Sequence, residues 1–223
     1  MKKIVVTIDG PAGAGKTTVS RMLADRLRYR YIDTGALYRA VALAVNLKEV
    51  HPADDMALEK ICHGLELRYV QTDSGLRLLS NGEDVTEKLR TPEITMLASA
   101  VSARPVVRRY LLDVQRAMGR QKAAVVEGRD MGTVVFPNAE IKFYLDANER
   151  TRARRRFLEL QSKNDLSLEE VERDLRKRDN NDSNRSEAPL KPAADAIRID
   201  STVMGIDAVV DVMLGHIARL TDG

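Results

Sequence analysis

Gly10-Pro-Ala-Gly-Ala-Gly-Lys-Thr17 is the stretch that decides the fold class of this 223-residue chain. It matches the pattern G-x-x-x-x-G-K-[ST], which is informative when a strand precedes it and a helix follows it. Residues 3–8 before it are mostly apolar and β-branched, as in a buried strand of a parallel sheet. After it, apolar residues recur at helical spacing, namely Val19, Met22, Leu23 and Leu27. The sequence therefore predicts a strand, a glycine-rich turn and a helix in direct succession.

A loop of this composition is suited to binding phosphate. Its glycines let successive backbone N–H groups turn toward one anion, and the N-terminus of the following helix adds positive charge. Lys16 is placed to reach the terminal phosphates, and the Thr17 hydroxyl is placed to hold Mg²⁺. We therefore expect ATP or GTP to bind here. The residues expected to bind it are Gly10, Pro11, Ala12, Gly13, Ala14, Gly15, Lys16, Thr17 and Thr18.

Strands and helices are predicted to alternate along most of the chain. Short apolar runs at residues 29–32, 123–126, 141–145 and 197–199 are typical of buried strands, and amphipathic helical patterns lie between them. This order predicts a three-layer α/β domain.

Two segments depart from this alternation. Residues 65–70 largely alternate between apolar and polar side chains, and residues 76–80 run into Asn81-Gly82, a dipeptide typical of tight hairpin turns, so a small antiparallel insertion is expected. Residues 150–156 carry five arginines in seven positions on a predicted helix. A second helix is expected to begin at the capping-box pair Ser167 and Glu170 and to end in the polar run 179–184.

The composition excludes several classes of protein. A single cysteine, Cys62, rules out a disulfide scaffold, and no apolar stretch approaches the roughly 18 residues that a membrane span requires. The balance of 36 basic against 33 acidic residues gives a net charge of only +3, and tryptophan is absent. We therefore expect a cytoplasmic protein that binds neither membrane nor nucleic acid. A monomer is the default expectation for a chain of this size.

Many arginines lie outside the phosphate loop, and several fall in predicted loops or at strand ends. They are Arg39, Arg108, Arg129, Arg150, Arg152, Arg154, Arg155, Arg156, Arg178 and Arg185. A guanidinium group can donate two hydrogen bonds to the oxygens of one phosphate, so a second phosphorylated substrate would explain these arginines. The loop alone leaves three outcomes open: a small-molecule kinase, a switch GTPase, or a motor or transport ATPase. No Asn-Lys-x-Asp run for guanine recognition is present, which disfavours the GTPase.

With these motifs the sequence resembles the bacterial cytidylate (CMP) kinases. The resemblance is collinear over nearly the whole chain. It is carried by residues 8–17, Asp33-Thr-Gly-Ala-Leu-Tyr-Arg39, Glu127-Gly-Arg-Asp-Met-Gly-Thr-Val-Val-Phe-Pro137, Arg178-Asp-Asn-Asn-Asp-Ser-Asn-Arg185 and Ala188-Pro-Leu190. Two small departures are Thr34, where serine is also common, and Glu127, where aspartate can occur. Glu127 is expected either to order the waters of a magnesium ion or simply to pack.

The resemblance implies a P-loop NTPase fold with a five-stranded parallel sheet, an antiparallel β-rich NMP-binding insertion and an Arg-rich helical lid. Residues 1–223 would form one kinase domain, with the insertion at about 36–103 and the lid at about 148–185. The implied reaction transfers phosphate from ATP to CMP or dCMP, with Mg²⁺, in pyrimidine nucleotide metabolism.

The resemblance also implies roles for individual residues. Ser99, Arg108 and Asp130 would recognise cytosine, and Arg178 and Asp182 would contact the ribose hydroxyls. Arg39, Arg129 and Arg185 would hold the acceptor phosphate and, with Lys16, form the catalytic set, although Arg185 stands at the boundary between phosphate and base. Thr34, Gly35 and Tyr38 would shape the acceptor site. Arg152, Arg155 and Arg156 would approach the ATP phosphates from the lid.

Two alternatives remain. One is another small-molecule kinase, acting on adenylate, uridylate or shikimate, against which the turn at residues 127–130 and the β insertion both argue. The other is a regulatory protein that binds ATP without turnover. Retention of Lys16, Arg129 and Asp182 together argues against the second alternative.

Overall fold

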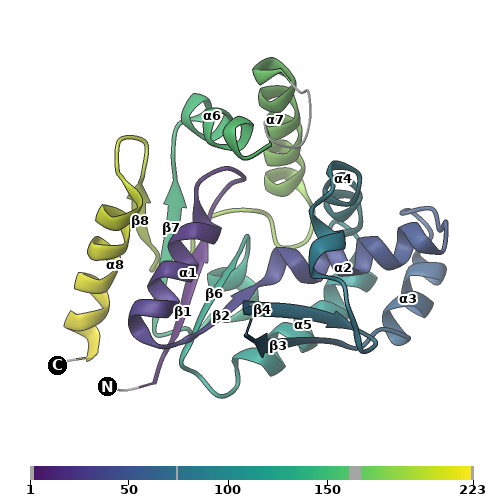
Figure 1. Cartoon of the computed structure of the whole chain (residues 1–223), viewed down its shortest axis with the longest axis horizontal. Helices are drawn as coiled ribbons and strands as arrows, with labels where there is room; N and C mark the ends of the chain where they lie inside the picture. Colours follow the sequence, from purple (N-terminus) through teal and green to yellow (C-terminus); the bar gives the residue numbers. More distant parts are fainter. Residues whose placement is uncertain (1–2, 74, 161–166, 222–223) are drawn as a thin grey trace. The chain divides into compact units, whose positions relative to one another are not determined.

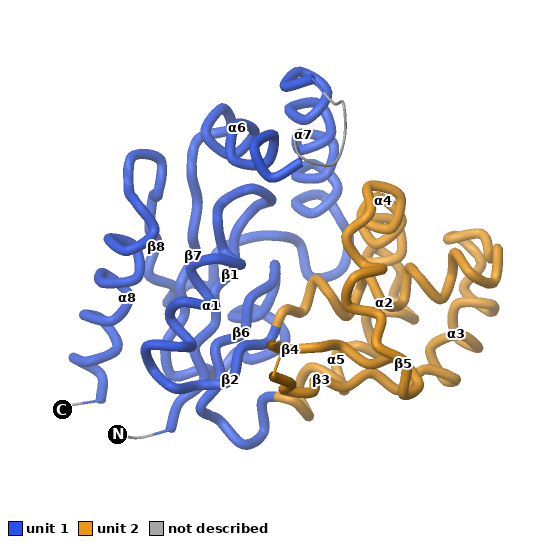
Figure 2. Tube along the Cα trace, in the orientation of Figure 1, with its two compact units in different colours: residues 1–32, 119–223 blue, residues 33–118 orange. Residues whose placement is uncertain are grey.

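The structure is a computed structural model that describes residues 3–73, 75–160 and 167–221 (Figure 1). The chain forms two compact units: unit 1 comprises residues 1–32 and 119–223, and unit 2 comprises residues 33–118 (Figure 2).

The helices and strands of unit 1 are β1 (Val5–Asp9), α1 (Lys16–Leu27), β2 (Arg30–Asp33, whose last residue opens unit 2), β6 (Ala124–Gly128), the π-helix η2 (Met131–Val135), β7 (Ile141–Asp146), α6 (Glu149–Leu160), α7 (Leu168–Asn184), β8 (Ile197–Asp200) and α8 (Ile206–Thr221). Those of unit 2 are α2 (Thr34–Leu47), α3 (Asp55–His63), β3 (Leu67–Thr72), β4 (Gly75–Ser80), β5 (Glu83–Asp84), the 3₁₀ helix η1 (Thr86–Arg90), α4 (Pro92–Val101) and α5 (Pro105–Gly119).

The centre of unit 1 is a five-stranded sheet in the order β2-β6-β1-β7-β8. β1 pairs in parallel with β6 and β7, and β7 pairs in parallel with β8, which confirms the predicted parallel sheet. Every residue of β1 and β6 is buried, as expected for inner strands with apolar side chains on both faces. Apolar residues of α1 and α8 pack with the strands in one core.

The register of this sheet determines where the loops meet. Asp9 at the end of β1 lies opposite Gly128 at the end of β6. Since the carboxyl ends of parallel strands share one edge of the sheet, the phosphate loop after β1 and the turn after β6 emerge side by side.

Helix α7 begins as predicted, because the Ser167 hydroxyl accepts from Glu170 N–H at 3.2 Å and the Glu170 carboxylate accepts from Ser167 N–H at 2.8 Å. The helix ends at Asn184, the last residue of the polar run 179–184 in which it was expected to end. Within this run Asp182 is buried and paired with Arg129, and such tertiary contacts outweigh weak helix propensity.

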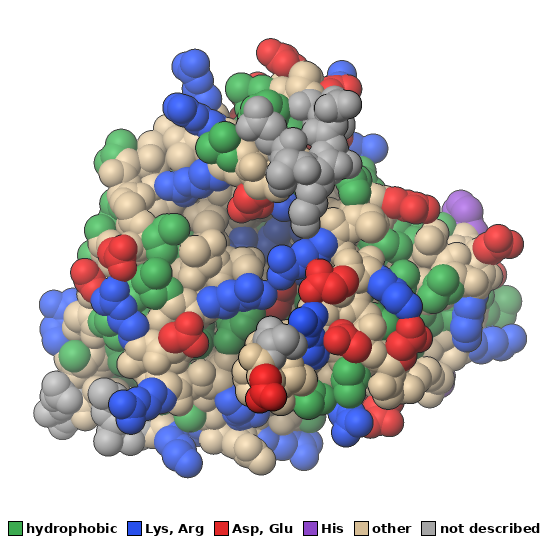
Figure 3. Space-filling view, in the orientation of Figure 1, with side chains coloured by type: hydrophobic (Ala, Val, Ile, Leu, Met, Phe, Trp, Pro, Cys, Tyr) green, Lys and Arg blue, Asp and Glu red, His purple; other side chains and the backbone are tan. Residues whose placement is uncertain are grey.

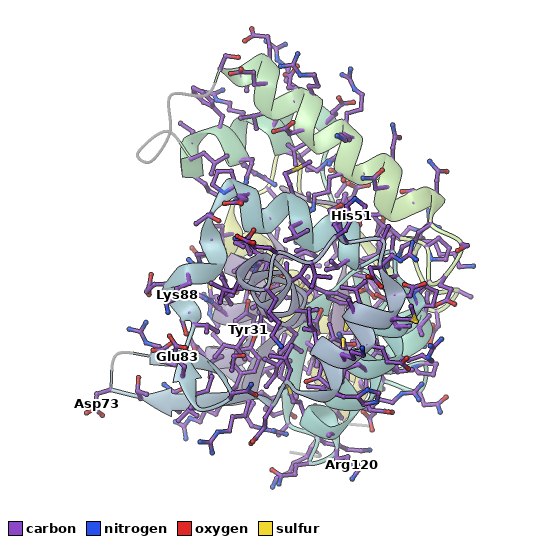
Figure 4. The ribbon with its side chains drawn as sticks, turned by 90° about the vertical axis from the view of Figure 1, so that its right-hand side faces the viewer. Tyr31, His51, Asp73, Glu83, Lys88 and Arg120 are labelled. Carbon is purple, nitrogen blue, oxygen red and sulfur yellow. The ribbon has the colours of Figure 1, made fainter. Side chains whose placement is uncertain are left out.

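Unit 2 contains the antiparallel sheet β3-β4-β5, which confirms the predicted insertion. Asn81 and Gly82 have φ values of 50° and 85° and form the tight turn between β4 and β5, as their dipeptide predicted. In Figure 4, Asp73 lies at the outer end of the β3–β4 hairpin. Glu83 lies beside Lys88, and the Lys88 ammonium is 2.5 Å from the Glu83 carboxylate.

Helix α3 was not predicted from the sequence. Asp54 is in fact the N-cap, because its side chain accepts from Ala57 N–H at 3.0 Å. Leu58, Ile61 and Cys62 form its buried side. Burial also raises the pKa of the Cys62 thiol to about 11, so at neutral pH the thiol stays protonated and packs as an apolar group.

Acidic and basic side chains are interspersed over the face of the molecule seen in Figure 3. Among residues 3–73, 75–160 and 167–221, we find no helix with the length and apolar character needed to cross a membrane.

Candidate active site

The phosphate loop joins β1 to α1 in unit 1. Gly10, Gly13 and Gly15 have φ values of +150°, +75° and +89°, which side-chain-bearing residues rarely adopt. A Cβ on Gly13 would come within 2.8 Å of the Arg152 carbonyl oxygen. The loop backbone therefore requires glycine at these three positions, where no side chain stands between the backbone and an anion.

Gly10 is the most constrained of these positions. A Cβ there would lie 2.0 Å from the Leu145 carbonyl oxygen, so Gly10→Ala must displace β1 from β7. We expect this variant to lose at least about 2 kcal/mol of unfolding free energy in urea titration, through strain and overpacking. The control is Gly205→Ala, since a Cβ at Gly205 has nothing within 4 Å. Equal stability of the two variants would contradict the described loop geometry.

Lys16, the first residue of α1, is only 6% exposed. Its ammonium donates to the Pro11 carbonyl at 2.6 Å. Burial lowers the pKa of Lys16 well below its usual range, and the Arg129 guanidinium lowers it further. A bound phosphate would supply the negative charge that this buried cation needs.

Thr17 and Glu127 bring oxygen atoms together beside the loop. The Thr17 hydroxyl donates to the Glu127 carboxylate at 3.3 Å, and the hydroxyl of Tyr31, labelled in Figure 4, donates to its other oxygen. Among the residues described, no group of three or more His, Cys, Asp or Glu side chains could hold a metal ion. Mg²⁺ in phosphoryl-transfer sites takes only one or two protein oxygens and otherwise waters and phosphates, so Thr17 and Glu127 fit such an ion. Tyr31 was not identified from the sequence, where it is simply a strand residue.

The turn after β6 forms a buried charge cluster with the end of α7. Arg129 Nε donates to Asp182 at 2.8 Å, and Arg185 Nη2 donates to Asp130 at 3.4 Å. A second nitrogen of Arg185 lies 4.0 Å from Asp182. The structure thus brings together four of the predicted acceptor residues.

The electrostatics of this cluster favour the charged forms. Burial acts to raise the pKa of Asp182, but the positive charges of Arg129, Arg178 and Arg185 outweigh it and hold the pKa below its usual range. Burial likewise acts to lower the pKa of Arg129, but Asp182 reverses the direction and raises it. Arg178 also belongs to this environment, because its charge acts on both Asp182 and Lys16.

The three arginines that were predicted to act from a lid occupy different positions. Arg152 is buried, and its guanidinium donates to the Ala12 carbonyl at 3.0 Å, so this side chain contacts the backbone of the phosphate loop. Arg155 donates to Ser201 O at 2.7 Å and reaches Ala14 O at 3.5 Å. Arg156 instead makes an exposed ion pair with Glu159 at 2.9 Å, and no contact between it and the loop is found in the described part of the chain.

Asp179 was missed in the sequence. Its carboxylate forms an ion pair with Arg152 and accepts from Ala12 N–H at 3.3 Å, so α7 contacts the same loop residue whose carbonyl Arg152 contacts from α6. Its contact with Ala12 spans 167 positions of the chain, so this role could not be identified from the local sequence.

Unit 2 carries the other predicted acceptor residues, in two groups. At the start of α2, Arg39 pairs with Asp33 at 3.1 Å, and Thr34 is 2% exposed and next to Gly35. Asp33 was not identified from the sequence; it is the N-cap of α2 and accepts from Ala36 N–H at 3.0 Å, a role that its place before a helix could have suggested.

The second group of unit 2 contains Arg108, Tyr38 and Ser99. The Arg108 guanidinium lies 5.8 Å from the centroid of the Tyr38 ring, and it donates to Ser102 O at 3.3 Å. The buried Ser99 hydroxyl and Arg39 Nε find no hydrogen-bond partner among the residues that the structure describes. Because buried polar atoms are nearly always hydrogen-bonded, both are suited to a polar ligand.

Asp9 is a further residue that the sequence did not reveal as part of the site. It is 3% exposed, and its carboxylate accepts from the N–H groups of Met131 and Gly132, both at 2.8 Å. Burial raises its pKa to about 6, although these two hydrogen bonds act to lower it. At neutral pH it is therefore a carboxylate that can accept on both oxygens.

Comparison with known proteins gives a consistent result. A family model described as Cytidylate kinase matches residues 6–219. A cytidylate kinase from Syntrophotalea carbinolica is 49% identical over 219 residues, covering 98% of this chain and 93% of that protein. One from Geobacter sulfurreducens is 49% identical over 211 residues, covering 94% and 91%. A solved structure of an uncharacterized protein from Eubacterium ventriosum has a TM-score of 0.53 at 12% identity, covering 98% of this chain and 99% of that one, which is a likeness of fold alone.

Proposed function

Because this chain belongs to the cytidylate kinase family, we propose that it transfers the terminal phosphoryl group of ATP to CMP or dCMP, giving ADP and CDP or dCDP. The observation that carries this assignment is the meeting of the phosphate loop and the Arg129 turn at one edge of the sheet. We further propose that the enzyme acts in the cytoplasm, as a monomer, in pyrimidine nucleotide metabolism.

The proposed mechanism depends on position and charge. The phosphate of CMP is already an anionic nucleophile, so no general base is required. Lys16 would bind the terminal phosphates of ATP, and Arg39, Arg129 and Arg185 would hold the acceptor phosphate in line with them. Asp182 supports this arrangement because its hydrogen bond to Nε at 2.8 Å orients the Arg129 guanidinium.

A magnesium ion would be held by the Thr17 hydroxyl, with Glu127 beside it. When bound, such an ion neutralises charge on the phosphates during transfer. Tyr31 and Thr17 engage both oxygens of Glu127, which fixes the orientation of this carboxylate.

Recognition of the base is proposed to rest on Ser99, Arg108 and Asp130. The exocyclic amine of cytosine needs an acceptor, which Asp130 or the Ser99 hydroxyl can provide, while Arg108 can donate to N3 or O2. The unpartnered Ser99 hydroxyl in unit 2 supports this role. Uracil exchanges a donor for an acceptor at position 4 and an acceptor for a donor at N3, so it would leave buried polar groups unpaired.

The remaining assignments complete the proposal. Arg178 and Asp182 would contact the ribose, Thr34, Gly35 and Tyr38 would shape the acceptor site, and Arg152, Arg155 and Arg156 would act from the lid. The NMP-binding insertion is proposed at about residues 36–103 and the lid at about 148–185, of which residues 161–166 lie outside the described residues.

An acceptor panel tests this function. ADP release with Mg·ATP is measured for CMP, dCMP, UMP, AMP, GMP and shikimate, and we expect kcat/KM for CMP and dCMP to exceed that for UMP by at least about 10²-fold. Equal turnover of UMP and CMP would contradict the base-recognition roles. Turnover of another acceptor alone would overturn the proposed substrate, and turnover of none would favour a regulatory ATP-binding protein.

A further inference from the structure

Asp9 lies at the end of β1, one residue before the phosphate loop. Its Oδ1 accepts from Met131 N–H and its Oδ2 from Gly132 N–H, each at 2.8 Å. These donors are separated from Asp9 by 122 and 123 residues in the chain. One carboxylate thus connects the strand that leads into the phosphate loop with the turn that follows β6.

Met131 and Gly132 are the first residues of η2. The first N–H groups of a helix have no partner within the helix, and a carboxylate near them is favourable. The preceding residue, Asp130, makes no side-chain capping hydrogen bond. Asp9 therefore caps η2 from a neighbouring strand.

Gly132 allows this close approach. A Cβ at this position would lie 3.1 Å from Lys142 Cδ, 3.2 Å from Thr7 Oγ1 and 3.4 Å from Asp9 Oδ2. Any side chain here would press against the residues that surround the carboxylate, whereas bare backbone lets both N–H groups reach it.

The capped turn contains Arg129 and Asp130. On one side, its backbone is fixed by the β1–β6 ladder, in which Asp9 lies opposite Gly128. On the other side, it is fixed by the two hydrogen bonds to the Asp9 side chain. The position of the Arg129 guanidinium, and of its hydrogen bond to Asp182, depends on this backbone.

The geometry points to Asp9 as a positioning residue that sets the place of Arg129 relative to the phosphate loop. It acts through the backbone of residues 131–132 and touches neither substrate. This inference rests on the proposed function, because it requires that Arg129 act on the acceptor phosphate during transfer.

The variant Asp9→Asn tests this role with little change in size. Its amide has a single acceptor oxygen, and its NH₂ group would face one of the two backbone N–H donors. A small displacement of a catalytic group can lower turnover strongly, so we expect kcat to fall about 10²-fold. KM for ATP should change less than about threefold, because the loop itself retains its residues. Asp207→Asn, an exposed aspartate that pairs with Arg26, is the matched control and should retain wild-type kcat.

A double-mutant cycle separates positioning from general destabilisation. If Asp9 acts through Arg129, Asp9→Asn should lower kcat by less than about threefold when introduced into Arg129→Ala, measured at raised enzyme concentration. The same loss in both backgrounds, or near-normal kcat for the single variant, would overturn the inference. The wild-type enzyme is assayed with CMP in the same experiment. If the wild type does not turn over CMP, the result counts against the proposed function and not against the role of Asp9.

Gly132→Ala provides a second variant should Asp9→Asn fail to fold. It keeps the carboxylate and crowds the turn that the carboxylate holds, so we expect about a tenfold fall in kcat with wild-type Arg129 and almost none with Arg129→Ala. Equal losses in the two backgrounds would again overturn the inference. Thermal unfolding of each variant establishes that the compared enzymes are folded.

Discussion

Arg129→Ala is expected to lower kcat for CMP by at least about 10³-fold, because removal of an arginine that neutralises a transferring phosphate typically costs that much. The Arg129 side chain is only 17% exposed, and Asp182 accepts a hydrogen bond of 2.8 Å from its guanidinium. Steady-state kinetics with Mg·ATP measure the loss. Near-normal turnover would rule out the role proposed for this residue.

A stability control separates this loss from unfolding. Removing one partner of a buried ion pair leaves the other uncompensated, which costs about 3 kcal/mol or more, although Arg185 remains 4.0 Å from Asp182. The double variant Arg129→Ala/Asp182→Asn also removes the Asp182 charge that Arg129→Ala leaves uncompensated. Part of the lost free energy of unfolding should therefore return, while kcat stays low. Arg26→Ala, which removes an exposed arginine paired with Asp207 and Asp211, should leave both kcat and stability unchanged. A recovery of kcat together with stability in the double variant would mean that Arg129 has only a structural role.

Lys16→Met is expected to lose activity without losing stability, whereas Arg129→Ala is expected to lose both. Loss of the charge that we propose to bind the ATP phosphates should lower kcat by about 10³-fold. In the free protein, however, Lys16 is a buried cation that lies near Arg129 and has a lowered pKa. Replacing it by an apolar side chain of similar length removes this unfavourable charge, so we expect the variant to unfold at or above the wild-type temperature.

Two measurements on this variant give the test. Differential scanning calorimetry compares the unfolding temperatures without nucleotide, and titration with Mg·ATP measures the loss of affinity. Stabilisation by saturating ATP should be large for the wild type and nearly absent for Lys16→Met. A variant that is much less stable than the wild type, or one that still binds ATP normally, would contradict the role and the environment described for Lys16.

The sequence was most informative where structure is determined by short patterns. The phosphate loop, the Asn81-Gly82 turn and the Ser167–Glu170 capping box each depend on residues close together in the chain, and each appears in the structure as predicted. The parallel sheet followed from the apolar strands on either side of helical segments. Helix α3 was missed because its buried side is short and lies among acidic residues.

Residues whose roles arise from tertiary contacts could not be found in this way. Asp9 acts on backbone groups 122 and 123 positions away, and Asp179 contacts Ala12 across 167 positions. Local composition carries no sign of such contacts. In α7, the polar run in which the helix was expected to end is helical as far as Asn184, and its acidic side chains pair with Arg129 and Arg152.

The most direct test of the proposed reaction follows the transferred phosphate itself. The enzyme is incubated with CMP and ATP labelled at the γ-phosphate, and the products are separated by ion-exchange chromatography. The account predicts that the label appears in the β-phosphate of CDP, with one ADP formed for each CDP. Label released as inorganic phosphate while CMP remains unchanged would contradict it, because the chain would then hydrolyse ATP and would not phosphorylate CMP.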